Sequence, residues 1–392
     1  VGPDGRLLAW TEDTSGRRQY VIRIRELDSG TLLPEAVAGV APDLVWAADA
    51  RTLLYIENDP ETLLTVRVKA HVAGSDPATD ALLYEEEDDS YYLGIDRSRD
   101  ERYLLIHASS TVSDEVRYAP LEAPHALAVL AARERGLEYD ADHHGGRWVI
   151  RTNADGATNF KLVTAADGAT ARSDWRDWVA HDPQVFIEGF ELFADFTAIA
   201  ERRGGLERLR LLHADGREES VAADEPAYSM GLDVNSEPDS DWLRYGYTSL
   251  TTPATVYEVN VRTGERRLLK RQPVPGYDPA DYVTERLWAS ARDGTRIPVS
   301  IVYHKGFRKD GRAALLQYGY GSYGLSMDPA FSPTVVSLLD RGMAYAIAHI
   351  RGGQELGRPW YEDGKLLKKQ NTFTDFIDVT DFLVREGYAA PD

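Results

Sequence analysis

The 392-residue sequence has no cysteine, so disulfide bonds and thiol chemistry are excluded from its fold and its function. It also has no apolar run near the ~20 residues that a helix needs to span a bilayer, which argues against a membrane-spanning segment. Positive charge is scarce, because 44 basic residues face 64 acidic ones and the formal net charge is −20. Nucleic acid is therefore not expected as a partner, since its binding requires clustered Lys and Arg.

The absence of cysteine permits a reducing compartment, and we expect the protein to be cytoplasmic. The chain opens with Val1-Gly-Pro-Asp-Gly5, which contains no initiator methionine and has the composition of a turn. We therefore expect the natural N-terminus, with any targeting signal, to lie upstream of Val1. The negative charge would attract cationic ligands, although solubility explains it equally well.

Residues 1–270 lack helical periodicity and contain a repeat of short strands. Six units align on their leading strands, at residues 7–10, 53–56, 103–106, 148–150, 197–199 and 243–245. A second strand in each unit ends in a turn, and successive turns lie 44 to 48 residues apart, at residues 30, 74, 120, 168, 216 and 264. A steady period of about 47 residues with several strands per unit is typical of a β-propeller rather than a β-sandwich.

A domain boundary is indicated by KRQPVPGY at residues 270–277, which is rich in Pro and Gly and has no periodicity. We assign residues 1–273 to the propeller and residues 274–392 to a second domain. In the second domain, Asp293-Gly294 between alternating strands predicts a hairpin. A buried strand then runs into an aromatic-glycine turn, another strand into an Arg-Gly-Gly turn, and an amphipathic helix follows. This order predicts an α/β sheet, and hence a two-domain chain.

Several motifs carry a family resemblance. YGYG at residues 318–321 and IRGG at 350–353 are shared across the prolyl oligopeptidase family of serine peptidases, which the sequence resembles. The run ELGRPWYEDGKLLKKQNTF is similar to the oligopeptidase B (protease II) branch. Upstream, RRQY, EEEDDSYY and LRYGYTSLTTPATVYE also fit that branch, so the resemblance covers nearly the whole chain.

The resemblance implies a seven-bladed β-propeller, of which six blades are visible, and the N-terminal half of an α/β-hydrolase domain. It implies hydrolysis of short peptides after Arg or Lys by a Ser-His-Asp triad, without a cofactor or metal. No G-x-S-x-G nucleophile elbow occurs in the sequence; the resemblance places the elbow within about twenty residues after Asp392, followed by the triad Asp and His and the acids that select Arg or Lys. We expect the chain to be a partial copy that needs the remainder of its polypeptide and is inactive alone.

Tyr320 is the leading candidate for a catalytic residue. It follows a buried strand, where ligand sites of open α/β sheets gather, and Gly319 and Gly321 permit a tight turn around it. In the family, the second tyrosine of YGYG donates its hydroxyl to the oxyanion of the tetrahedral intermediate, and Tyr320 matches that position. Arg351 and its two following glycines are expected to shape a turn beside the same site.

Asp328 is a secondary candidate, for binding a basic residue of the substrate. Some bacterial oligopeptidase B enzymes carry two acids spaced as Asp-x-Asp here, and the resemblance implies that they hold a basic residue near the cleavage site. This chain keeps Asp328 but has Ala330 at the second position, which weakens the expected subsite. A turn residue before Pro329 is an equally good interpretation of Asp328.

Other patterns do not predict a site. The hexapeptide from Gly319 to Gly324 fits G-x-G-x-x-G, but no helix opens after it, as dinucleotide binding requires. Asp142-His-His144 lacks a third metal ligand at suitable spacing. Hydrolases of this fold order their triad Ser, Asp, His along the chain. His349 precedes the expected elbow, so it is not expected to be the triad histidine. The acidic run at residues 85–89 predicts a solvated surface segment.

Two other classes of function stay open. One is a proline-specific or acylaminoacyl peptidase of the same superfamily, which reporter peptides would distinguish. The other is a non-catalytic propeller scaffold, which an elbow without serine would indicate.

Overall fold

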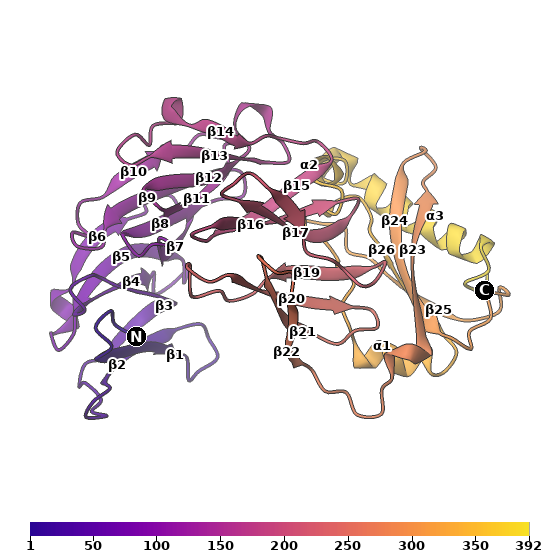
Figure 1. Cartoon of the computed structure of the whole chain (residues 1–392), viewed down its shortest axis with the longest axis horizontal. Coiled ribbons are helices and arrows are strands. Elements are labelled where there is room, and N and C mark those ends of the chain that lie inside the picture. Colours follow the sequence, from indigo (N-terminus) through magenta and orange to yellow (C-terminus); the bar gives the residue numbers. More distant parts are fainter. Residues whose placement is uncertain (392) are drawn as a thin grey trace. The chain divides into compact units, whose positions relative to one another are not determined.

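A computed structural model describes residues 1–391 and divides them into two compact units. The first unit comprises residues 1–155 and 161–180, and the second comprises residues 156–160 and those from 181 onwards. Strands fill the N-terminal two thirds of the chain, and the α-helices follow them in sequence (Figure 1). In this described part of the chain no helix has the length and apolar character that crossing a membrane requires. The expected boundary between residues 273 and 274 stays a prediction.

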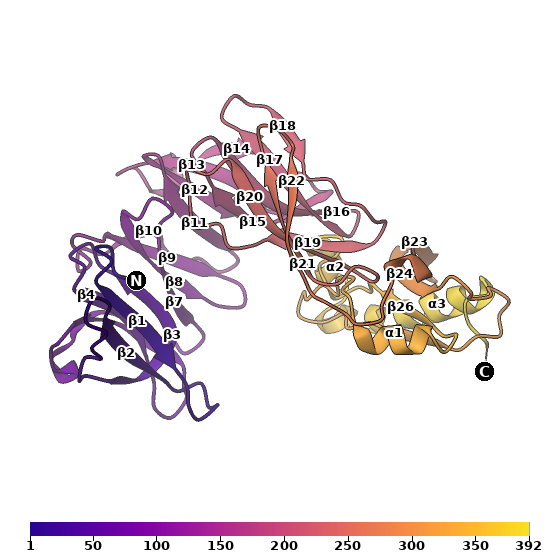
Figure 2. The same cartoon turned by 60° about the horizontal axis from the view of Figure 1, so that its bottom comes forward.

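The first unit contains three antiparallel sheets (Figure 2). The largest has six strands in chain order: β1 (Leu7–Glu12), β2 (Tyr20–Glu26), β3 (Val37–Trp46), β4 (Thr52–Asn58), β5 (Thr65–Val72) and β6 (Ala81–Glu85). The second comprises β7 (Tyr92–Arg97), β8 (Tyr103–Ser109), β9 (Asp114–Pro120) and β10 (Ala128–Ala131). The third comprises β11 (Tyr139–His144), β12 (Arg147–Thr152), β13 (Lys161–Ala166) and β14 (Arg176–Val179).

Strand β3 takes part in two units of the repeat. Its first residues, Val37 to Val40, pair with β2, and its last residues, Leu44 to Trp46, pair with β4. Val40 also pairs with Glu57 of β4, and the register of β3 with β4 shifts between Val40 and Leu44, as it does at a β-bulge. The six-stranded sheet therefore joins one repeat unit, made of β1, β2 and the start of β3, to a second unit made of the end of β3 and β4–β6.

The second unit begins with two further antiparallel sheets. One is built from β15 (Val185–Leu192), β16 (Phe196–Arg203), β17 (Leu206–His213) and β18 (Glu218–Ser220). The other is built from β19 (Tyr228–Leu232), β20 (Trp242–Ser249), β21 (Thr255–Asn260) and β22 (Arg266–Arg271). Phe196, Leu209, Leu243 and Tyr257 belong to one core that the two sheets share, so the sheets pack face to face.

Four of the six strands that the sequence identified as leading, β8, β12, β16 and β20, are the second strands of their sheets, which corrects the prediction for these four. β8 shows the reason, because Leu104, Leu105 and Ile106 are all buried and the strand is covered on both faces. Such strands read as continuous apolar runs. The first strand of the next sheet, β11, carries Asp and His at several positions, which weakens its signal in the sequence.

A mixed sheet follows, with strand order β23-β24-β26-β25. It is built from β23 (Tyr282–Ser290), β24 (Arg296–His304), β25 (Leu315–Tyr318) and β26 (Ala344–Ala348). β23 and β24 form the hairpin that Asp293-Gly294 predicted, and Gly294 has φ +86° in the turn between them. β25 and β26 are parallel, so both run towards the same edge of the sheet.

Three α-helices and five short 3-10 helices complete the described part of the chain. The α-helices are α1 (Pro333–Leu339), α2 (Arg358–Glu362) and α3 (Gln370–Arg385). The 3-10 helices are η1 (Pro77–Thr79), η2 (Ala154–Gly156), η3 (Arg172–Asp174), η4 (Pro279–Asp281) and η5 (Leu366–Lys368). Helix α3 buries Thr372, Asp375, Val379 and Leu383. This spacing puts the four residues on one face, and its apolar members join the core of the mixed sheet.

A buried ion pair joins α3 to the turn after β26. Arg351 donates from Nε to Asp375 Oδ2 at 2.8 Å and from Nη2 to Asp375 Oδ1 at 2.5 Å, and both side chains are buried. Arg351 Nη1 also donates to Asp293 in the hairpin turn at 2.7 Å. The backbone N–H of Thr295, together with Arg351, lowers the pKa of Asp293 to about 2. Arg351 thus connects the turn after β26, helix α3 and the hairpin turn between β23 and β24, which fits its expected role in shaping a turn.

Asp375→Asn tests the importance of this pair for stability. The variant leaves the Arg351 guanidinium without its buried counter-charge, and we expect the free energy of unfolding of the full-length protein to fall by about 3 kcal/mol in urea denaturation. Asp381→Asn makes the same change at an exposed position of α3 and should cost less than about 0.5 kcal/mol. Equal losses in the two variants would contradict the assignment.

Candidate active site

Tyr320 lies directly after β25, in a turn that we call the Tyr320 turn (residues 319–324). Its side chain is 41% exposed, and within residues 1–391 its hydroxyl has no hydrogen-bond partner. Strand β25 ends at the sheet edge where parallel strands of α/β proteins present their binding residues. The phenol is therefore free to donate to an external group, as the predicted role requires, and that role stays a prediction.

The Tyr320 turn packs closely against the turn after β26, which we call the Arg351 turn (residues 350–353). Gly321 has φ +64°, and a Cβ placed there would lie 2.5 Å from Thr372 Cγ2 and 2.8 Å from Ile350 Cγ1. Gly352 has φ +105°, and its Cβ would overlap the carbonyl oxygen of Gly321. The backbone N–H of Gly324 donates to the Gly352 carbonyl at 2.9 Å. Glycine is required at both positions because the two turns meet backbone against backbone.

Asp328, the second predicted residue, lies further along the loop between β25 and α1 and is paired with Arg202 of β16. The guanidinium donates to both carboxylate oxygens, at 2.6 and 2.7 Å, in a bidentate arrangement. Glu188 and Glu207 accept from the same guanidinium at 2.6 and 2.9 Å. Burial and the charge of Asp328 raise the pKa of Glu207. A basic substrate residue would therefore share Asp328 with an internal partner.

Sequence reasoning did not identify Arg202 or its carboxylate partners. Arg202 and Asp328 are 126 residues apart, and Arg202 lies in an Ala-Glu-Arg-Arg-Gly stretch with no distinctive motif. The one available signal was indirect. A charged side chain on a strand that is expected to be buried requires a counter-charge.

His349 lies in a buried polar cluster under the sheet edge. Arg286 Nη1 is 2.9 Å from His349 Nε2 and donates to Ser300 Oγ at 2.8 Å. Arginine has only donors, so Nε2 accepts and the neutral imidazole carries its proton on Nδ1. Burial and the charge of Arg286 lower the pKa of His349 well below its ordinary value. Burial raises the pKa of Glu355 to about 7, and Glu355 accepts from the backbone N–H of Met327. This arrangement agrees with a structural histidine.

Two other sequence patterns serve structural roles in the first unit. Glu86, expected to be solvated in the acidic run, is buried and accepts from Arg133 at 2.6 Å, which corrects the prediction. The two residues are 47 positions apart, so no local pattern predicts the pair. His143 lies within 2.8 Å of the carboxylates of Asp100 and Asp167. In the described residues, no three His, Asp or Glu side chains are grouped as metal ligands.

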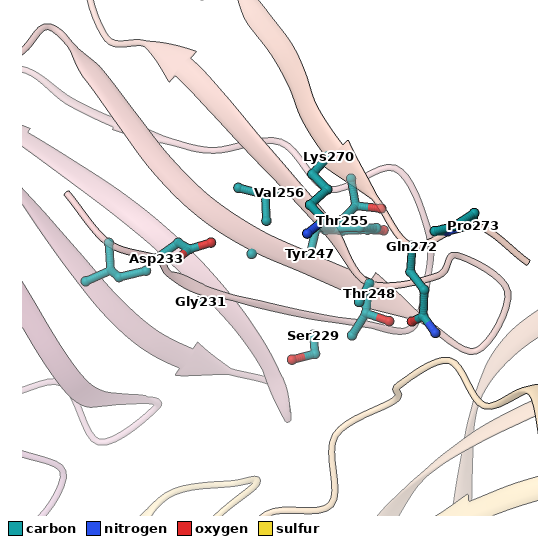
Figure 3. A pocket seen from close by; sticks show the side chains of 13 residues that line it. Ser229, Gly231, Asp233, Tyr247, Thr248, Thr255, Val256, Lys270, Gln272 and Pro273 are labelled. Atoms are coloured by element: carbon teal, nitrogen blue, oxygen red, sulfur yellow. The ribbon is translucent and has the colours of Figure 1, made fainter. Parts of the chain in front are cut away.

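A hollow of about 610 Å³ lies on the sheet of β19–β22, and Figure 3 shows the residues that line it. The lining is mostly small, apolar or uncharged, with Lys270 and Asp233 as its charged members. It contains neither histidine nor Tyr320. The hollow therefore contains neither Tyr320 nor Asp328 and is not the candidate active site.

Comparisons with known proteins agree with the motifs. Residues 1–272 match the family model "Prolyl oligopeptidase, N-terminal beta-propeller domain", and residues 329–392 match "Prolyl oligopeptidase family". A dipeptidyl aminopeptidase BI from Pseudoxanthomonas mexicana is 64% identical over 100% of this chain and 54% of its own length. A protease 2 from Moraxella lacunata is 34% identical over 99% of this chain and 56% of its own length.

A solved structure of oligopeptidase B from Leishmania major matches with a TM-score of 0.93 and 37% identity, over 99% of this chain and 56% of that one. The chain spans about half the length of the relatives that it matches. These matches confirm the predicted fold class of a propeller domain followed by part of a hydrolase domain. The chain belongs to the prolyl oligopeptidase family.

Proposed function

We propose that the full-length protein is a serine peptidase that hydrolyses short peptides after Arg or Lys. The observation that carries the proposal is the free, half-exposed phenol of Tyr320 at the carboxyl end of β25, in a chain of this peptidase family. The proposal includes a cytoplasmic location and excludes nucleic acid and membranes as partners. The net charge of −20 and the absence of cysteine support these parts of it.

The proposed reaction is acyl transfer to a serine. The serine oxygen attacks the peptide carbonyl, the bond to the leaving amine breaks, and water then hydrolyses the acyl-enzyme. Tyr320 donates its hydroxyl to the carbonyl oxygen as negative charge develops there. Within residues 1–391, β25 pairs only with β26, so a parallel strand added at its other edge would end beside the Tyr320 turn. We propose that the nucleophile strand occupies that edge.

Preference for Arg and Lys is supported by the similarity to protease 2 and oligopeptidase B and by the acids that gather around Asp328. Asp328, Glu188 and Glu207 all accept hydrogen bonds from the guanidinium of Arg202, so this cluster gathers three acids. A cationic side chain of a substrate would be attracted to it. Asp328 is the acid of this cluster that lies nearest to Tyr320 in the sequence. We propose that it contributes to a basic subsite.

Release of dipeptides from free N-termini is a second candidate function. The 64% identity to a dipeptidyl aminopeptidase over the whole chain favours it. Both candidates place a cationic group of the substrate near the acids, either an Arg or Lys side chain or an N-terminal ammonium. They differ in whether a blocked N-terminus is tolerated.

Tyr320→Phe in the full-length enzyme tests the catalytic assignment. Loss of one oxyanion donor is expected to lower kcat by about 10²-fold and to leave KM nearly unchanged, because the bond is made in the transition state. Tyr323→Phe is the matched control, since Tyr323 lies in the same turn and is 81% exposed. A Tyr320→Phe variant with the wild-type kcat would refute the proposed role.

Reporter peptides test the specificity. We expect a peptide ending in Arg to be cleaved at least about 10-fold faster than one ending in Pro, and to be cleaved with its N-terminus acylated. Cleavage of the Arg peptide only when its N-terminus is free and the Arg is the second residue would establish the second candidate. Preference for the Pro peptide would refute both. Residues 1–392 alone serve as a blank and are expected to show no cleavage.

A further inference from the structure

We propose that Lys369 is a positioning residue for Tyr320. The inference rests on the proposed function, in which the Tyr320 hydroxyl donates to the oxyanion. Within residues 1–391 the phenol hydroxyl has no hydrogen-bond partner, so no hydrogen bond fixes its direction. The backbone of the Tyr320 turn carries the ring, so its position contributes to where the hydroxyl points.

Lys369 makes charged hydrogen bonds to that turn. Its ammonium donates to the carbonyl oxygen of Gly321, the residue directly after Tyr320, and to Ser322 Oγ at 2.7 Å. Thr372 Oγ1 lies 3.3 Å from the same Gly321 carbonyl and donates to the Arg351 carbonyl at 2.7 Å. One ammonium thus contacts two consecutive residues of the turn, and a charged donor makes a stronger bond than a neutral one.

The position of Lys369 is otherwise unfavourable. It stands at the N-cap of α3, where the helix dipole disfavours a cation and where its side chain caps no backbone N–H. Burial lowers its pKa. In the described part of the chain its ammonium has no carboxylate within ion-pair distance, whereas the neighbouring Lys365 and Lys368 pair with Glu362 and Asp363. Among the described residues the hydrogen bonds of this ammonium go to the Tyr320 turn, and a cation at such an unfavourable position indicates a functional reason for its placement.

The geometry explains how Lys369 would affect the reaction. Gly321 cannot move towards α3 or the Arg351 turn, because Thr372 and Ile350 already fill that space. Movement away from them is opposed by the bond from Lys369. Without the ammonium the turn gains freedom in that direction, and the Tyr320 hydroxyl would be displaced from the oxyanion. A displacement of about 1 Å can reduce the rate by as much as about 10²-fold.

The test uses the full-length enzyme with Lys369→Met, Tyr320→Phe and the double variant, and with Lys368→Met as control. Lys368 is adjacent and pairs with Asp363 at the surface. We expect Lys369→Met to lower kcat by about 10-fold or more with KM changed by less than about two-fold, and to have no further effect when Tyr320 is already Phe. Lys368→Met is expected to leave both constants unchanged.

Several results would overturn the inference. A Lys369→Met enzyme with wild-type kcat, or an equal loss of kcat in the Tyr320→Phe background, would show that Lys369 does not act through Tyr320. If Tyr320→Phe itself is fully active, the proposed function fails together with this inference; if only Lys369→Met is fully active, the inference alone fails. If Lys369→Met does not fold, Lys369→Gln replaces it as the test variant. Glutamine keeps an amide donor group without the charge, and we expect an intermediate kcat at unchanged KM. A wild-type kcat, or a change confined to KM, would refute the proposal.

Discussion

The contact between the Tyr320 turn and the Arg351 turn is the constraint on which the candidate site depends. Both turns follow parallel strands that end at the same edge of the sheet, and they meet at Gly321 and Gly352 with no room for a side chain between them. This contact brings the Gly321 and Arg351 carbonyls to Thr372 at the start of α3. The position of Tyr320 is therefore determined by backbone packing rather than by contacts of its own hydroxyl.

Buried guanidiniums hold the surroundings of this contact in place. Arg351 pairs with Asp375 of α3, and Arg202 of β16 pairs with Asp328 in the loop that begins with the Tyr320 turn. A buried ion pair contributes little net stability but is costly to break, so both pairs favour one arrangement of the segments that they join. The loop is consequently fixed near its start by α3 and near its end by a strand of the propeller domain.

Local patterns in the sequence predicted much of this. The propeller repeat was visible because strands such as β8 are buried on both faces and form apolar runs, and the Tyr320 turn was visible from its glycines and aromatics. Contacts between distant residues were not predictable. Arg202 meets Asp328 across 126 positions and Arg133 meets Glu86 across 47, and neither pair has a local signal. Lys369 also had no local signal, because its partner is a backbone carbonyl.

A crystal structure of the full-length enzyme with a peptide aldehyde bound to its nucleophile would test the central claim most directly. The covalent adduct carries an oxygen where the oxyanion of the intermediate forms. We predict that the Tyr320 hydroxyl lies about 2.7–3.1 Å from that oxygen, with the Lys369 ammonium still bound to the Gly321 carbonyl. An adduct whose oxygen is held by other donors, with the Tyr320 phenol directed away from it, would contradict the account.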